Sequence, residues 1–275
     1  EGSAGIANKF GIPQIVIGLT IVAMGTSMPE AAVSISAALR GSAEITIGNV
    51  VGSNIMNILV ILGLTAVVCQ IAVQKTTIHY EIPMVIGVTI LLAVMGLQNN
   101  IISRAEGVIL LACMVVYMLY LLRLAKRGVV ENEEMDAYAK QVSFGRLILL
   151  VVVGVAAIIF GSHVAVEAAS AIARIFGISE RFIGLTIVAF GTSLPELVTS
   201  VAAARRGNSD IAVGNIVGSN LFNIMFVVGI TAVIVPVAAA VLLPVCVYRG
   251  RVLKRRHGLL MLACYGGYFA YLLLA

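Results

Sequence analysis

The stretch Ile17-Gly-Leu-Thr-Ile-Val-Ala-Met-Gly-Thr-Ser-Met-Pro-Glu30 places a carboxylate, a proline, two glycines and three hydroxyls in an otherwise apolar run. It returns as Ile183-Gly-Leu-Thr-Ile-Val-Ala-Phe-Gly-Thr-Ser-Leu-Pro-Glu196, with twelve of the fourteen positions identical and a constant offset of 166. An internal repeat of this kind indicates how the whole chain is built. The sequence therefore predicts two copies of one unit, each with polar groups inside an apolar segment.

The composition is that of a polytopic membrane protein. Of the 275 residues, 60% are hydrophobic and 11% are charged, and the mean hydropathy is +1.07. Soluble domains carry about 25% charged residues. The net charge of +5 comes from short loops without interleaved aromatics, so we expect no nucleic-acid partner. The four cysteines are scattered through apolar segments and form neither a metal-ligand spacing nor a disulfide framework.

Eight apolar segments approach the length of about 20 residues that a membrane helix needs. A polar stretch around 126–146 separates them into two groups. We therefore expect a first membrane half over residues 1–125, a linker over 126–144 and a second membrane half over 145–275. The predicted spans are 12–39, 45–69, 82–98, 105–124, 147–173, 178–204, 211–235 and 258–275, with a shorter apolar segment at 236–248.

The repeat extends beyond the opening stretch and is uneven. Phe10-Gly11-Ile12 matches Phe176-Gly177-Ile178 at the same offset, but nothing precedes residue 1 to match the helix expected near Gly145. Later, Gly107 matches Gly258 at a smaller offset of 151, so the second half is the shorter one after Thr231. We therefore predict an all-α fold of five plus five transmembrane helices, with the first absent and the ninth shortened in this chain.

Orientation follows from the distribution of Lys and Arg, which favour cytoplasmic loops. Alternating the spans puts 14 of the 18 basic residues on one side, together with the 126–144 linker and the 249–257 loop. That side is predicted to be cytoplasmic, in a multi-pass protein of the cell membrane. Equivalent points of the two copies are five spans apart, an odd number, so the copies are predicted to be inverted, a recurring plan of secondary transporters.

Glu30 and Glu196 each fall within an apolar span that contains no Lys or Arg partner near its centre. An ionised carboxylate in hydrocarbon must be paired, coordinated or protonated, so each glutamate is expected to hold a proton or a cation. A proline inside a helix frees backbone carbonyls one turn earlier. With Pro29 and Pro195 doing so beside threonines and serines, the site offers only oxygens, which suit Ca²⁺, Na⁺ or Mg²⁺.

A second motif repeats in the next span. Gly48-Asn-Val-Val-Gly-Ser-Asn-Ile-Met-Asn57 matches Gly214-Asn-Ile-Val-Gly-Ser-Asn-Leu-Phe-Asn223. Ser53 and Asn57 share a helix face, and their neutral oxygens would complete the shell around the carboxylates. The glycines at the first and fifth positions of each motif are interpreted as sites of close helix packing. For Asn49 and Asn215, cation ligand and interhelical hydrogen bond remain equally open.

Gly-Thr-Ser-x-Pro-Glu followed by Gly-Ser-Asn-x-x-Asn, present twice and inverted, resembles the alpha repeats of the sodium/calcium exchangers. The resemblance covers nearly the whole chain and is nearest to the prokaryotic branch of the cation/calcium antiporter superfamily. It implies ten transmembrane helices, alternating access with Na⁺ and Ca²⁺ as transported ions, no cofactor and no enzymatic activity. It also implies four cation sites at the midplane. The ligands that it implies are Glu30, Glu196, Thr26, Thr192, Ala23, Ala189, Ser27, Ser193, Ser53, Ser219, Asn57 and Asn223, with the threonines and alanines acting through their carbonyls.

Two other functions stay open. A Ca²⁺/H⁺ antiporter would release Ca²⁺ by protonating Glu30 and Glu196, although the relatives that exchange protons carry a different acidic motif in place of Gly-Ser-Asn. A cation channel is more often a symmetric oligomer around a pore, whereas here one chain supplies both halves and is expected to act as a monomer. Some relatives, including those that also carry K⁺, have Asp at the position of Asn223, so Asn there argues against K⁺ co-transport.

Overall fold

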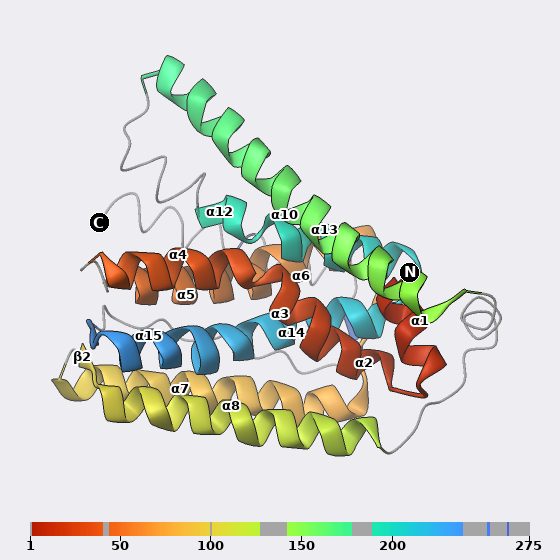
Figure 1. Cartoon of the computed structure of the whole chain (residues 1–275), viewed down its shortest axis with the longest axis horizontal. Coiled ribbons are helices and arrows are strands. Elements are labelled where there is room, and N and C mark those ends of the chain that lie inside the picture. The colour runs from red at the N-terminus through yellow and green to blue at the C-terminus, as the bar shows by residue number, and fades with distance from the viewer. Residues whose placement is uncertain are drawn as a thin grey trace.

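The computed structural model describes residues 2–40, 44–99, 101–126, 142–177, 189–238, 252–253 and 263. Helices make up nearly all of the described chain, and most of them run alongside one another in Figure 1. Among the described residues, four π-helical turns, labelled η, lie within or at the start of the longer helical spans. The helices of the first half are α1 (Gly2–Lys9), α2 (Gln14–Ile17), η1 (Gly18–Val22), α3 (Ala23–Thr26), α4 (Met28–Leu39), α5 (Glu44–Ile55), η2 (Met56–Ile61), α6 (Leu62–Val68), η3 (Thr77–Glu81), α7 (Ile82–Asn99) and α8 (Arg104–Ala125).

The second half begins with a long helix that leaves the body of the protein at an angle, α10 (Phe144–Ile175) (Figure 1). Its side chains are almost all on the surface of the protein, as expected of a helix whose apolar residues face lipid. The remaining helices are α12 (Ala189–Thr192), α13 (Leu194–Arg205), α14 (Ser209–Phe222), η5 (Asn223–Val228) and α15 (Gly229–Ile234).

Six of the predicted membrane spans are present as helices of sufficient length and apolarity. Five are continuous, and the sixth consists of two helices bent by 46° at Ser27. The continuous spans are Thr46–Val68, Thr77–Leu97, Arg104–Ala125, Phe144–Ile172 and Ser209–Ile234. The predicted span 178–204 is described only from Ala189 onward, while 236–248, 258–275 and the centre of the 126–144 linker lie almost wholly outside the described residues.

The two halves carry matching elements at the predicted offsets. Helix α1 ends at Lys9 and α10 ends at Ile175, the position that the repeat predicts. Each helix is followed by a glycine with positive φ, Gly11 at 60° and Gly177 at 73°. Glycine adopts this left-handed conformation without steric cost, so it ends both helices in the same way. The fold therefore confirms the all-α repeat architecture.

The described residues include four very short strands that join the halves. β1 (Ile71–Ala72) pairs antiparallel with β4 (Val252–Leu253), and β2 (Ile101–Ile102) pairs antiparallel with β3 (Val237–Ala238). β1 and β3 are related by the larger of the two offsets read from the sequence, and β2 and β4 are related by the smaller one. Each strand pair thus joins one element of each repeat, and the two pairs are equivalent by the repeat symmetry.

Helix α14 lies at the centre of the protein and is mostly buried. A Cβ on Gly214 would meet the Ile15 carbonyl oxygen at 2.9 Å, and one on Gly218 would meet the Leu19 carbonyl oxygen at 2.7 Å. These glycines therefore allow α14 to pack closely against α2 and η1, as predicted. For Gly48 and Gly52 on α5 the matching neighbours would be residues 180–188, which lie outside the described residues, so close packing there stays a prediction.

Candidate cation-binding site

The repeated stretch forms a broken helix in each half. Ser27 separates α3 from α4, Ser193 separates α12 from α13, and each proline follows within the first turn of the new helix. We expected Pro29 and Pro195 inside continuous helices. Instead they occupy a position where the missing N–H is not needed, which favours a new helix start over a kink. Glu30 and Glu196 consequently lie in the first turns of α4 and α13, where the helix dipole stabilises negative charge.

The two glutamates are buried and joined across the repeats. Glu30 is 1% exposed and Glu196 is not exposed. The Ser27 hydroxyl donates to Glu196 Oε1 at 2.7 Å, and the Ser193 hydroxyl donates to Glu30 Oε1 at 3.1 Å. Each serine thus binds the glutamate of the other repeat, and the carboxylates are close enough for their charges to repel. A cation between them would relieve that repulsion.

Among the predicted ligand side chains, four buried oxygens have no hydrogen-bond partner within the described part of the chain: Glu30 Oε2, Glu196 Oε2, Asn57 Oδ1 and Asn223 Oδ1. They come in two pairs related by the repeat, and the elements that carry them are in contact. Helix η2, with Asn57, packs against α13, while η5, with Asn223, packs against α4. An unpaired buried acceptor costs about 1–3 kcal/mol, so four together indicate oxygens directed at a cation.

Two further asparagines orient this set. Asn57 Nδ2 donates to Asn220 Oδ1 at 3.0 Å, and Asn223 Nδ2 donates to Asn54 Oδ1 at 3.1 Å. These bonds occupy the amide nitrogens and leave the oxygens of Asn57 and Asn223 available. Sequence reasoning assigned no role to Asn54 and Asn220, although both lie inside the repeated motif. Their position one helical turn before Asn57 and Asn223 was the signal that could have indicated a shared helix face.

Asn49 and Asn215 make the interhelical hydrogen bonds that were one of their two predicted roles. Asn49 Nδ2 donates to the Glu30 carbonyl oxygen at 3.1 Å, and Asn215 Nδ2 donates to the Glu196 carbonyl oxygen at 3.3 Å. Asn215 Oδ1 also accepts from the Thr26 hydroxyl at 3.0 Å. Both side chains therefore make interhelical hydrogen bonds that hold the first turns of α4 and α13 in place.

The other predicted residues lie around the same region. Ser219 donates weakly toward Glu196 Oε1 at 3.3 Å and the Ala23 carbonyl oxygen at 3.4 Å. Ser27 N–H also donates to that carbonyl at 3.0 Å, so a cation at Ala23 would share the oxygen with helix hydrogen bonds. The remaining members differ in exposure: Thr26 and Ser53 are buried, Thr192 is half-buried, and Ala189 is placed as the first residue of α12.

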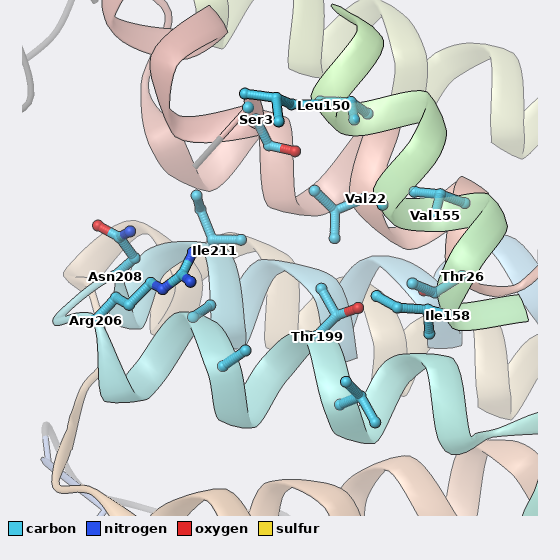
Figure 2. Close-up of a pocket in the computed structure, with 16 residues that line it drawn as sticks. Ser3, Val22, Thr26, Leu150, Val155, Ile158, Thr199, Arg206, Asn208 and Ile211 are labelled. Carbon is cyan, nitrogen blue, oxygen red and sulfur yellow. The ribbon is translucent and has the colours of Figure 1, made fainter. Parts of the chain in front are cut away.

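A cavity of about 280 Å³ reaches this region from one side. Its walls come from α1, η1, α3, α10, α13 and the start of α14. Thr26 and Thr199 lie at one end of the view in Figure 2, and Arg206 and Asn208 lie at the other. Thr26 directly precedes the helix break at Ser27, so the cavity leads from the end of α13 to the edge of the site.

Comparison with known proteins agrees with this geometry. The profile of the sodium/calcium exchanger protein family matches residues 1–123 and 146–274. The chain belongs to the sodium/calcium exchanger family. Among its relatives, the inner membrane protein YrbG of Escherichia coli is 38% identical over 239 residues, which cover 84% of this chain and 73% of YrbG. The sodium/calcium exchanger MaX1 of Methanosarcina acetivorans is 30% identical over 281 residues, covering 87% of this chain and 79% of MaX1.

A solved structure has the same fold. The sodium-calcium exchanger NCX_Mj, soaked with 2.5 mM Na⁺ and 1 mM Sr²⁺, superposes with a TM-score of 0.81 at 30% sequence identity. The match covers 98% of this chain and 90% of NCX_Mj. The inverted-repeat arrangement is consistent with that fold. The protein is therefore a helical membrane transporter, a cation/Ca²⁺ antiporter by family, and not an enzyme.

Proposed function

We propose that this exchanger moves Ca²⁺ in one direction and Na⁺ in the other across the cell membrane, by alternating access of one buried pocket. The observation that carries the proposal is the symmetric set of four unpartnered oxygens from Glu30, Glu196, Asn57 and Asn223, found within the described chain. Two negative charges neutralise one Ca²⁺, and the neutral oxygens supply part of the 6–8 ligands that Ca²⁺ takes. We assign the central ligand role to the two glutamates.

Na⁺ can use the same oxygens with less charge at each position. The serines and asparagines around the glutamates would form flanking Na⁺ positions, with Ser27, Ser53 and Asn57 contributed by the first half and their counterparts by the second. Because Ca²⁺ and several Na⁺ need the same two carboxylates, only one kind of load fits at a time. Such competition, followed by a change of the side that is open, produces exchange rather than leakage.

The broken helices support the movement that exchange requires. Each break joins two short helices at a serine that reaches the opposite repeat, so a shift of one repeat against the other alters both carboxylate environments together. The cavity that ends at Thr26 is a candidate for one access route. The pocket is complete within one chain, which supports a monomeric transport unit, and we propose the cytoplasm as the location of the 126–144 linker and the 249–257 loop.

Ion-gradient-driven Ca²⁺ uptake into proteoliposomes tests the proposal. Vesicles loaded with Na⁺ and diluted into Na⁺-free buffer should accumulate Ca²⁺, and external Na⁺ should release it. Internal choline or K⁺ in place of Na⁺ should give no uptake. Uptake driven equally well by a pH gradient without Na⁺ would favour the proton antiporter instead, and single-channel currents would favour a channel.

A further inference from the structure

A second group of buried polar atoms lies outside the pocket. Besides the four oxygens described above, the buried side-chain oxygens that lack a partner in the described chain include Glu81 Oε2, Thr77 Oγ1 and the Tyr117 hydroxyl. Thr77 and Glu81 are not exposed at all, and Tyr117 is 1% exposed. Among the described residues, one other place besides the central pocket therefore has a buried carboxylate oxygen without a hydrogen-bond partner. It lies between η3 and α8.

These three residues form one cluster with Tyr120. Thr77 and Glu81 are the first and last residues of η3, one turn apart. Tyr120 on α8 donates its hydroxyl hydrogen to Glu81 Oε1, and its ring stacks against that of Tyr117 with centroids 6.5 Å apart. Tyr117 lies one helical turn before Tyr120 on the same face of α8, and its buried hydroxyl has no partner within the described chain. One carboxylate and two hydroxyl oxygens thus gather where η3 meets α8.

Within the described part of the chain, no basic side chain balances the charge of the Glu81 carboxylate. Across the described ranges, no Lys, Arg or His nitrogen forms an ion pair with Glu81, and the ion pair found there joins His163 and Glu167 on α10. The nearest basic side chains in sequence, Lys75 and His79, are exposed, and His79 Nδ1 lies 2.7 Å from the Lys75 carbonyl oxygen. An unpaired carboxylate in this setting requires a bound cation or a proton.

We propose that Glu81, Thr77 and Tyr117 form a second, single-ion site for Na⁺. One carboxylate neutralises one monovalent cation, whereas Ca²⁺ would leave an uncompensated positive charge and would find few of the 6–8 oxygens that it takes. Glu81 supplies Oε2, and the two hydroxyls supply neutral oxygens. Tyr120 holds Glu81 Oε1 and so fixes the direction of the carboxylate. None of these residues belongs to the central pocket.

The helices around the proposed Na⁺ site also pack against helices of the central pocket. Helix α8 packs against η5 and α15, and α7, which continues η3, also contacts η5. Asn223, a member of the central oxygen set, is the first residue of η5. Na⁺ bound between η3 and α8 would therefore fasten together the two helices that support one side of the pocket.

Radiolabelled Na⁺ binding to purified protein in detergent tests the site. In a Glu30→Gln, Glu196→Gln background, where the central carboxylates are absent, we expect one saturable Na⁺ site to remain. Adding Glu81→Gln should remove it. Adding Tyr117→Phe instead should weaken it about tenfold, the effect of losing one ligand to a charged group. Adding Glu106→Gln, in the exposed capping box at the start of α8, should leave it unchanged.

Each outcome of these binding measurements either supports or overturns the proposed Na⁺ site. Failure of the double variant to bind Na⁺ would overturn the proposal and assign a proton to Glu81. The proposal would also be overturned if Ca²⁺ or K⁺ displaced the label at lower concentrations than unlabelled Na⁺ does. Should Glu81→Gln lose its helical circular dichroism, the Tyr117→Phe result decides, and unchanged Na⁺ affinity there would count against the site. The proposed exchange function is independent of this result, since the pocket glutamates are absent throughout.

Discussion

The two copies of the second motif have almost the same sequence, and each packs against the helix that carries a pocket glutamate. On α5 the motif runs from Gly48 to Asn57, and on α14 it runs from Gly214 to Asn223. Their first asparagines make equivalent hydrogen bonds to the glutamate carbonyls of α4 and α13. On α14, α2 and η1 pack directly against Gly214 and Gly218. At the repeat offset, the matching neighbours of Gly48 and Gly52 are residues 180–188, which lie outside the described residues.

These shared hydrogen bonds show that the chemistry of the pocket follows the motif, so the surrounding side chains are duplicated with nearly equal geometry. Close helix packing on the glycines is observed on α14, and the repeat predicts it for α5. Substitutions of pocket residues, and of matching glycines, should therefore act alike in the two halves.

The largest effect is expected from the pocket carboxylates. Glu30→Gln and Glu196→Gln should each reduce Ca²⁺ transport to background, because Ca²⁺ needs the negative charge as well as the oxygen. Ca²⁺ flux in proteoliposomes measures this, with Glu167→Gln on the exposed face of α10 as the control. Near wild-type flux in one variant but not the other would break the functional equivalence of the halves.

The glycines test whether close helix packing repeats together with the motif. Gly218→Ala should destabilise the protein by about 1–3 kcal/mol, since its Cβ would overlap the Leu19 backbone and the Ala23 side chain. Gly52→Ala, the matching change on α5, should destabilise it by a similar amount, because the repeat predicts an equally close neighbour there. Thermal unfolding followed by circular dichroism compares the two. A loss for Gly218→Ala alone would show that the two motifs are packed unequally.

A smaller change is expected when charge is added to the pocket. Asn223→Asp should strengthen cation binding and alter the competition between ions, admitting K⁺ or H⁺, because a third carboxylate adds negative charge to the same set of oxygens. Asn57→Asp should do the same if the halves are equivalent. Transport titrated against Na⁺, K⁺ and pH measures both. An unchanged profile for Asn223→Asp would remove that residue from the pocket.

The smallest effect should come from the orienting asparagines. Asn220→Ala and Asn54→Ala each remove the acceptor that holds a neighbouring amide, which leaves Asn57 or Asn223 free to rotate. Losing one such bond is worth about 1 kcal/mol, so Ca²⁺ affinity should fall about fivefold. Calorimetric titration of Ca²⁺ measures this change. A loss as complete as that of Glu30→Gln would instead make Asn54 or Asn220 a direct ligand.

Much of the pocket could be predicted from sequence because its residues occur in two copies of the same motifs. Repetition made Glu30, Glu196 and their motif neighbours stand out from an apolar chain, and the structure gathers them at one place. Pro29 was predicted to lie inside a helix, whereas the structure breaks the helix at Ser27, because a proline in an apolar run does not reveal whether it lies within a helix or begins one. The roles of Asn54 and Asn220 depend on which way an amide points across the interface between halves, which no residue pattern specifies.

Glu81 was missed for a related reason. It occurs once, at the border of an apolar segment that begins at residue 82, where an acidic residue is ordinarily solvated. Only the approach of α8 to η3 buries it. Sequence repetition therefore identifies the symmetric part of the molecule well and gives no information about features that arise in one half alone.

The central claim is that Ca²⁺ and several Na⁺ occupy the same carboxylate-centred pocket in turn. Radiolabelled Ca²⁺ binding to the purified protein at increasing Na⁺ concentration tests it most directly. We expect Na⁺ to raise the apparent Kd for Ca²⁺ without lowering the number of Ca²⁺ sites, and to do so more steeply than first order in Na⁺. Ca²⁺ binding that is insensitive to Na⁺, or that loses sites at constant Kd, would contradict a shared pocket.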